Sequence, residues 1–448
     1  MTVITRVLCL LLLAAWTAEG SSDKVVYSGH WHSLFESLSP LFEALPGVNL
    51  SVWQASLLVL VPVCLVWPGA WRGRPGAMDA AILASLGSVA VTFIWGWLCG
   101  GAAYSAYFQL WRFLSSLLVG VLLLSAIRTP RDLKALGLTV LVAALIRGTL
   151  VIYFYWAHVR GRIEPPPAYM TTHDDSLLFV AGLLVSLSWA MMQGTLKKWF
   201  VVILVWSHLL YAVTLNNRRL AWIELLLALV VMYALLPSSP LRRRATRAVL
   251  VAAPVLVTYV ALGGSRTEPI FAPARALSTS GSDEDASSLA RLEEMKNLLY
   301  TLSAAGNPIL GTGWGRPYLK VTSVYANFGP EWWLYLYTPH NSLLGVAVFG
   351  GLVGVCGIWL VVPVAAFLAA RGYRGGVGAI HRAAALAALG VLPAYGVQCY
   401  GDIGFQSLTC NLILGVAVAT AGRAAAWVPA RRDREGPSRR PDLAADRA

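Results

Sequence analysis

Residues 341–369 read NSLLGVAVFGGLVGVCGIWLVVPVAAFLA, a run without a single charged side chain. Such a run is typical of a helix that crosses the roughly 30 Å hydrocarbon core of a bilayer. The pattern recurs along the chain and predicts an all-α integral membrane protein with about twelve transmembrane helices. The predicted spans are 4–19, 52–71, 78–98, 108–127, 135–156, 176–193, 199–214, 220–236, 247–263, 341–369, 383–398 and 407–424.

Composition supports the same class. Of the 448 residues, 57% are hydrophobic and 13% are charged, whereas about a quarter are charged in soluble domains. The net charge of +13 lies mostly in short loops between apolar runs, where it sets topology, so we expect no nucleic-acid partner. The six cysteines are scattered, mostly within apolar runs, and no pair has metal-ligand spacing, so neither a zinc site nor a disulfide framework is predicted.

The first apolar segment has two interpretations. Thr5-Arg6, the Leu/Ala run that follows and the small residues of 18–22 also resemble a signal peptide. We favour a retained helix, because eleven further spans follow and the parity of twelve agrees with the charge pattern below.

Basic residues predict the orientation, because loops rich in Lys and Arg stay in the cytoplasm. They occupy every second loop: Arg72, Arg74, Arg128, Arg131, Lys134, Lys197, Lys198, Arg242, Arg243, Arg244, Arg247, Arg371, Arg374 and Arg382. The alternate loops are then periplasmic: 20–51, 99–107, 157–175, 215–219, 264–340 and 399–406. The chain divides into helices 1–9 (1–263), a large, partly helical periplasmic loop (264–340), helices 10–12 (341–426) and a charged tail (427–448).

Arginines in the outer loops run against this trend and predict an anionic ligand. They are Arg160, Arg162, Arg218, Arg219, Arg266, Arg275, Arg291 and Arg316. The guanidinium fork matches phosphate geometry, so a diphosphate or an acidic sugar is one candidate. Anionic lipid headgroups and local ion pairs are the alternatives.

The large loop is expected to contain a helix from about 286 to 305. Acidic and hydroxyl residues at 283–288 suit its start, and the Gly-Asn-Pro of 306–308 stops it. Helical periodicity places Arg291 on an apolar face with Leu299, and Asn297 on the opposite face. We expect Arg291 to point into a cavity and to have an anionic partner there. Snorkelling at the edge of the apolar stripe is the alternative.

Two further features flank the next span. The glycine-rich turn 311–315 lacks a dinucleotide-binding spacing and lets backbone pass close to a ligand or to another helix. His340 precedes a helix start that Asn341 or Ser342 can cap, which holds the imidazole at the membrane boundary. A histidine in this position is more often structural than catalytic, but an arginine-rich loop converges on the same face.

Three polar residues are expected within the membrane: Arg147, His208 and Glu224. Ionisable groups at this depth usually face a cavity or a partner. Glu224 lies about one turn below Arg218 and Arg219, so it is expected to orient an arginine or to pair with Arg147. A purely structural ion pair is the alternative.

Three motifs in order resemble the O-antigen ligase and polymerase superfamily. Residues 217–222 (NRRLAW) look like the family's arginine-containing entry to the eighth span, with Asn-Arg where a Ser is usual, so Arg219 is the closer match. Residues 288–291 (SLAR) with 307–315 (NPILGTGWG) resemble the loop arginine and its Pro-x-x-Gly-x-Gly segment. Residues 340–344 (HNSLL) look like its His-Asn helix entry.

The resemblance implies a GT-C-like membrane enzyme of the bacterial inner membrane. Its reaction is inverting transfer of a glycan from a polyprenyl-diphosphate carrier to a hydroxyl of a glycan or lipid A–core acceptor, at the periplasmic face and without a metal or other cofactor. The residues assigned to catalysis are His340, Arg291 and Arg219. Those assigned to substrate binding are Arg218, Arg266, Glu224, Gly313 and Asn341.

Competing functions remain open at this point. Ligation of a finished polysaccharide and polymerisation of repeat units differ in the acceptor, and the motifs barely separate them. The loop 157–175 lacks the glycine-ended arginine motif described for polymerases, which slightly favours a ligase. A transporter of lipid-linked sugars is a further alternative, but it is disfavoured because the two halves of the chain show no internal repeat.

Overall fold

The computed structural model describes residues 3–18, 51–66, 74–163, 170–237, 240–266, 271, 274–275, 286–322 and 335–428. The described part is helical and contains no sheet. Its longer elements are α1 (Val3–Ala18), α3 (Val52–Val66), α4 (Gly76–Leu98), α5 (Ala103–Ala126), α6 (Pro130–Phe154), α7 (Asp175–Gln193), α8 (Leu196–Leu215), α9 (Arg219–Leu235), α10 (Pro240–Gly263), α12 (Ala286–Ala304), α13 (Ser342–Val353), α14 (Val361–Gly375), α15 (Ala379–Gly401) and α16 (Leu408–Ala426). Short π-helical or 3₁₀ turns occupy Tyr155–Val159, Gly354–Ile358 and Gly404–Gln406.

Each of the twelve predicted spans contains a described helix, which confirms the all-α membrane fold. Nine candidate spans in the described residues are long and apolar enough to cross a bilayer. The helices α1, α3 and α9 are shorter, at 16, 15 and 17 residues, so the count of twelve spans stays a prediction. Helices suit this environment because lipid offers no partner for an unpaired backbone amide or carbonyl.

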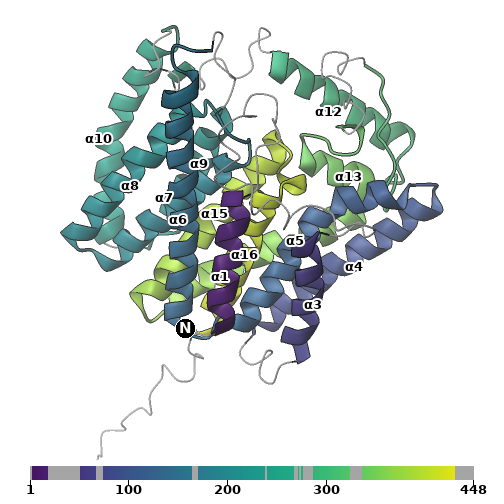
Figure 1. The fold of residues 1–448 in the computed structure, drawn as a ribbon, viewed down its shortest axis with the longest axis horizontal. Coiled ribbons are helices and arrows are strands. Elements are labelled where there is room, and N and C mark those ends of the chain that lie inside the picture. Colours follow the sequence, from purple (N-terminus) through teal and green to yellow (C-terminus); the bar gives the residue numbers. More distant parts are fainter. Residues whose placement is uncertain are drawn as a thin grey trace, which may run out of the picture.

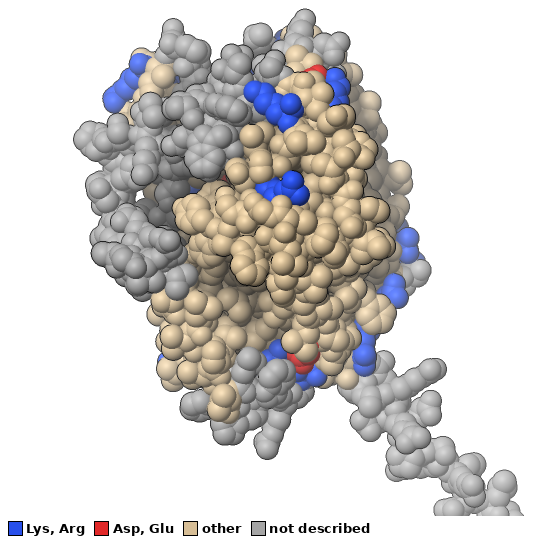
Figure 2. All heavy atoms as spheres, turned by 90° about the vertical axis from the view of Figure 1, so that its right-hand side faces the viewer, with Lys and Arg blue, Asp and Glu red and all other residues tan. Residues whose placement is uncertain are grey.

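The bundle is built around α16. Residues Leu408–Ala425 of this helix are buried on all sides, and α5, α14 and α15 pack against it (Figure 1). The helix α1 packs between α5 and α6, where the Thr5 hydroxyl donates to the carbonyl of Ala126. Many large hydrophobic side chains of the described helices are exposed, and in Figure 2 uncharged residues make up most of the coloured surface.

The bundle has two ends, at which different sets of helices begin and end. At the basic end, α5 ends, α6 and α15 begin, and α16 ends. Contacts from His381 to the carbonyl of Ala424 and from Arg423 to the carbonyl of Leu124 join these termini. At the opposite end, which we call the site end, α7 and α9 begin, α15 ends, and α12 lies over the helices (Figure 1). The basic end contains the loops that the sequence predicts to be cytoplasmic.

The predicted tenth span is broken, and the glycine-rich turn fills the break. Gly351 has a φ of 55°, and α13 gives way to a π-helical turn three residues later. Backbone amides of Thr312 and Gly313 donate to α13 carbonyls at 2.8 and 2.9 Å, and those of Leu352 and Val353 donate to residues 308 and 309 at 3.0 and 2.9 Å. The turn thus satisfies backbone groups that the interrupted helix leaves unpaired.

The loop helix α12 matches the predicted range, and Leu298 on its predicted apolar face is buried, but two positions depart from the predicted faces. Asn297 is fully buried, whereas Leu299 is 53% exposed. The Asn297 amide oxygen accepts N–H groups of Val321 and Thr322 at 2.9 and 3.0 Å, and the Thr301 hydroxyl accepts that of Leu319. The prediction was wrong here because it weighed hydropathy alone, while the returning chain needs polar side chains to satisfy its backbone. The predicted helix start at 283–285 lies outside the described residues.

Candidate functional site

An acidic residue at the end of α15 is the centre of the site end. Asp402 is 3% exposed, and its Oδ2 lies 3.5 Å from His173 Nδ1 and 3.8 Å from an Arg291 guanidinium nitrogen. Burial acts to raise the Asp402 pKa, but the nearby positive groups outweigh it and lower that pKa below its ordinary value of 3.8. The groups responsible are His173, His340, Arg291 and Arg218. Asp402 is therefore an ionised carboxylate shared among cationic side chains.

Arg291 has the anionic partner that the sequence predicts. It projects from α12 towards Asp402, and its side chain is 36% exposed. A guanidinium that is held on one side by a buried carboxylate and open on the other can still bind a second anion. Arg291 is thus a partly exposed side chain at the site end, paired with a buried carboxylate. The cavity that the sequence predicts for it stays a prediction.

His340 is held by a second carboxylate from α12. Its Nδ1 lies 3.2 Å from Glu294 Oε1, its backbone N–H donates to Glu294 Oε2 at 2.9 Å, and its ring stacks on Tyr335. Burial lowers the His340 pKa, but the hydrogen bond and charge of Glu294, with a smaller contribution from Asp402, more than offset it. The His340 pKa is consequently raised above 6.5. Because Nδ1 faces the carboxylate, Nε2 is the nitrogen left to exchange a proton.

Arg218 joins the cluster through His173. One Arg218 guanidinium nitrogen lies 3.4 Å from His173 Nε2, while Nδ1 of the same ring faces Asp402. Arg218 is the residue before α9, and Arg219 is the first residue of that helix, half-buried. Arg291 and His173 thus contact Asp402 directly, and Arg218 joins them through His173. His340 lies near enough for its charge to act on Asp402, and the four side chains come from four separate segments of the chain.

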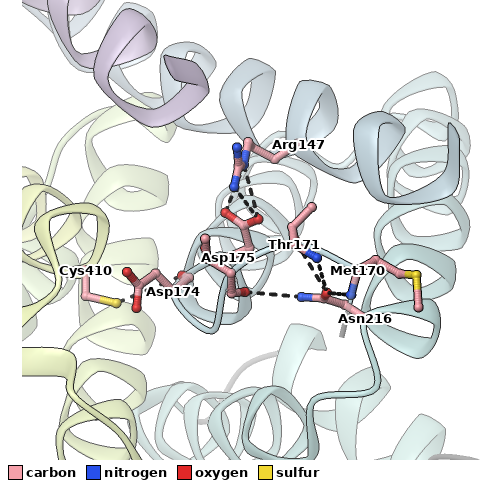
Figure 3. Close-up of polar contacts among 8 residues, drawn as sticks. Arg147, Met170, Thr171, Asp174, Asp175, Asn216 and Cys410 are labelled. Carbon is pink, nitrogen blue, oxygen red and sulfur yellow. Dashed lines mark hydrogen bonds and ion pairs between the residues drawn. The ribbon is translucent and has the colours of Figure 1, made fainter. Parts of the chain in front are cut away.

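A polar network behind the site holds the segment that carries His173 (Figure 3). The Asn216 amide oxygen accepts the backbone N–H groups of Met170 and Thr171 at 2.9 and 3.0 Å. Arg147 and Asp175 form a fully buried pair with contacts of 2.8–3.1 Å. These bonds anchor both sides of His173 to the bundle, so the imidazole has a defined position against Asp402.

The Arg147–Asp175 pair corrects one prediction about Glu224. Arg147 contacts Asp175 and not Glu224, because α6 and α7 are neighbours in the bundle while Glu224 lies on α9. Glu224 is fully buried, and its carboxyl oxygens have no hydrogen-bond partner among the described residues. Glu224 lies five residues after Arg219, which begins α9 at the site end, so its carboxyl group is buried beneath the cationic cluster. His208 contacts Thr149 at 3.2 Å.

The remaining predicted site residues lie in different environments. Arg266 is exposed at the end of α10, where it stacks over Phe271 at 5.6 Å, and no described contact brings it into the cluster. A Cβ added at Gly313 would lie 2.1 Å from the Cα of Gly96 on α4. The glycine-rich turn was predicted to pass close to a ligand or to another helix, and here it passes close to a helix. Asn341 caps α13, since its side chain accepts the N–H of Leu344 at 3.0 Å.

Three residues of the cluster were not singled out from the sequence: His173, Glu294 and Asp402. Each lies in or beside a predicted outer loop, and a census of charged residues in those loops would have included them. No local motif separates them from other polar residues. The described residues contain no group of three or more His, Cys, Asp or Glu side chains arranged to hold a metal ion.

The fold and the cluster together define a class of protein. It is a polytopic helical membrane protein with a cluster of arginine and histidine side chains at one end of its helix bundle. Residues 200–359 match the family model described as O-antigen ligase. This match confirms the resemblance in the three motifs and supports membership of the O-antigen ligase and polymerase superfamily, whose enzymes are of the glycosyltransferase type. The matched range includes Arg218, Arg291 and His340 but neither His173 nor Asp402. No curated protein matches the chain.

Proposed function

We propose that this protein transfers a glycan from a polyprenyl-diphosphate carrier to a sugar hydroxyl, with inversion at the anomeric carbon, as an O-antigen ligase does. The observation that carries the proposal is the cluster at the site end of the bundle. Arg291 contacts Asp402, Arg218 reaches the same carboxylate through His173, and His340 pairs with Glu294 on the helix that carries Arg291. On the orientation that the basic loops predict, this end is periplasmic and the membrane is the bacterial inner membrane.

The leaving group of this reaction is a lipid diphosphate, so negative charge grows on its bridging oxygen as the glycosidic bond breaks. Groups already in place to meet that charge stabilise the transition state. Arg291 is suited to this role because Asp402 orients it while more than a third of its side chain stays accessible. We assign the pair Arg218–Arg219 to the second contact with the diphosphate, from the start of α9.

The acceptor hydroxyl must lose a proton as it attacks. We assign this proton to Nε2 of His340, because Nδ1 faces Glu294. Glu294 holds the ring in one tautomer and stabilises the imidazolium that forms, as the carboxylate does in other histidine–carboxylate pairs. The base must be neutral to act, so the transfer rate is expected to rise as pH increases through the His340 pKa.

Purified full-length protein in detergent provides the test. With a polyprenyl-diphosphate-linked glycan and a glycan or lipid A–core acceptor, we expect transfer by the unmodified protein and a loss of at least about 10²-fold in kcat for His340→Ala and Arg291→Ala. Lys296→Ala is the matched control. Lys296 lies on the same helix as Arg291, but its ammonium pairs with Glu293 on the solvent side. Normal transfer by folded His340→Ala and Arg291→Ala would refute the proposal.

The same experiment separates the alternatives. Transfer in detergent, without a sealed compartment, excludes transport as the sole activity. Ligation and polymerisation are distinguished by lipopolysaccharide banding in a deletion strain: loss of a polymerase leaves core plus one repeat unit, while loss of a ligase removes that band too. Complementation of the strain with His340→Ala then tests the site within the cell.

A further inference from the structure

Two adjoining cavities at the basic end of the bundle are not used by the proposed reaction. The first, which we call the apolar groove, has a volume of about 270 Å³ and lies between α6, α7, α15 and α16. Its lining is almost entirely aliphatic, apart from Lys134, Ser186, Trp189 and Thr420. Leu138 and Val201 on its edge are 55% and 41% exposed, so the groove is open to the surface that faces lipid.

The second cavity, which we call the polar cavity, continues the groove at the basic end. It has a volume of about 570 Å³ and shares Ile380 with the groove. Its walls include Arg128, Gln193, Trp427 and the first turn of α15, where Gly378 and Ala379 lie. An aliphatic channel that ends in a polar chamber can hold one acyl chain of a membrane lipid together with its head group.

The charges around the polar cavity favour an anionic head group. Arg128 lines the cavity, Lys134 lines the adjoining end of the groove, and the Lys198 ammonium bonds to Gln193 on the cavity wall. The first turn of α15 adds backbone N–H groups, the positive end of a helix dipole. Asp132, at the start of α6, is fully buried, and its Oδ2 accepts the N–H groups of Arg128 and Thr129 within a helix cap. Asp132 does not line either cavity, and the ionisable side chains that do line them are basic: Arg128, Lys134 and His381.

We propose that the apolar groove and the polar cavity together bind an anionic glycerophospholipid of the cytoplasmic leaflet, one acyl chain in the groove and the phosphate beside Arg128 and Lys134. Basic pockets between helices at the cytoplasmic surface are a known mode of phospholipid recognition. Trp189 on the groove and Trp427 on the cavity suit the interfacial depth at which a head group lies.

This lipid is distinct from the proposed donor. The helix α15 begins at the polar cavity and ends beside Asp402, and its 23 residues span roughly 34 Å at 1.5 Å per residue. The diphosphate of the donor is assigned to the site end, a full helix length away. The lipid site therefore stands whether or not the proposed reaction is correct.

Native mass spectrometry of the full-length protein in detergent tests the proposal. Titration with phosphatidylglycerol and with phosphatidylcholine of the same acyl chains should show at least tenfold tighter binding of phosphatidylglycerol. In the double variant Arg128→Gln/Lys134→Gln, phosphatidylglycerol binding should weaken about ten- to thirtyfold, to the level of phosphatidylcholine, since each cation near the phosphate contributes on the order of 1 kcal/mol. The variant Ala384→Phe fills the groove and should weaken both lipids.

Matched controls and outcomes make the test decisive. Arg243→Gln/Arg244→Gln removes two exposed cations from α10 and should leave binding unchanged. Unchanged phosphatidylglycerol binding in Arg128→Gln/Lys134→Gln would overturn the proposal, as would displacement of phosphatidylglycerol by a lower concentration of polyprenyl phosphate. Thermal unfolding in detergent checks that each variant is folded. If Ala384→Phe does not fold, the charge variant, which changes no aliphatic lining residue, still decides the outcome.

Discussion

The pair formed by Glu294 and His340 yields the sharpest test of the proposed chemistry. Glu294→Gln keeps the volume of the side chain and one oxygen that can accept the backbone N–H of His340, which Glu294 now accepts at 2.9 Å. It removes the negative charge that lies 3.2 Å from Nδ1. The fold should therefore survive while the electrostatic support of the imidazole is lost.

The magnitude follows from that distance. Two unit charges 3.2 Å apart interact by about 5 kcal/mol at an effective dielectric constant of about 20. If the imidazole carries about half a unit of positive charge in the transition state, the lost stabilisation is roughly 2–3 kcal/mol, or about 10²-fold in kcat. Since Glu294 is what raises the His340 pKa, the acid limb of the rate–pH profile should also move to lower pH.

The assay is transfer of a labelled glycan by purified protein, with kcat measured across pH 5 to 9. Glu293→Gln is the matched control, because Glu293 neighbours Glu294 on α12 but pairs with Lys296 on the solvent side. That variant should keep both the rate and the acid limb. If Glu294→Gln also keeps both while remaining folded, Glu294 does not orient a catalytic base and the role assigned to His340 is wrong.

Two further predictions concern the residues that shape the site. Asp402→Asn should lower kcat/KM by about tenfold or more, because Arg291 and His173 lose the charge that positions them. Folding lowers the Asp402 pKa, so the ionised carboxylate stabilises the folded protein at pH values above its ordinary pKa of about 3.8. This stabilisation is lost as pH falls through the lower pKa of the folded state. In Asp402→Asn, the free energy of unfolding should therefore fall less steeply with decreasing pH. Gly351→Ala should destabilise the protein by about 2–4 kcal/mol in thermal unfolding, because φ is positive and a Cβ would lie 2.5 Å from the backbone nitrogen of Gly311. Gly87→Ala, with no neighbour within 4 Å, should be neutral or stabilising, and equal melting temperatures for the two alanine variants would contradict this account of the break.

The helices were predictable from the sequence because they depend on local facts. Runs such as 341–369 must pair their own backbone groups in lipid, so length and hydropathy suffice to identify them. The helix Ala286–Ala304 and the cap at Asn341 follow equally from nearby residues. The candidates Arg291 and His340 could also be identified from nearby residues. Arg291 is a charge on a predicted apolar face, and His340 precedes a capped helix start at the membrane boundary.

The meeting of those candidates was decided only by the tertiary structure. Asp402 follows His340 by 62 positions and belongs to another helix, and His173 comes from a third segment. Hydropathy predicts the number of membrane spans, but it does not predict which loops lie next to one another once the helices pack. The same holds for α12, where the polar side chains of Asn297 and Thr301 are buried because they bind the backbone of the returning chain. Partners that satisfy buried polar groups are distant in sequence, so they become visible only once the helices are packed.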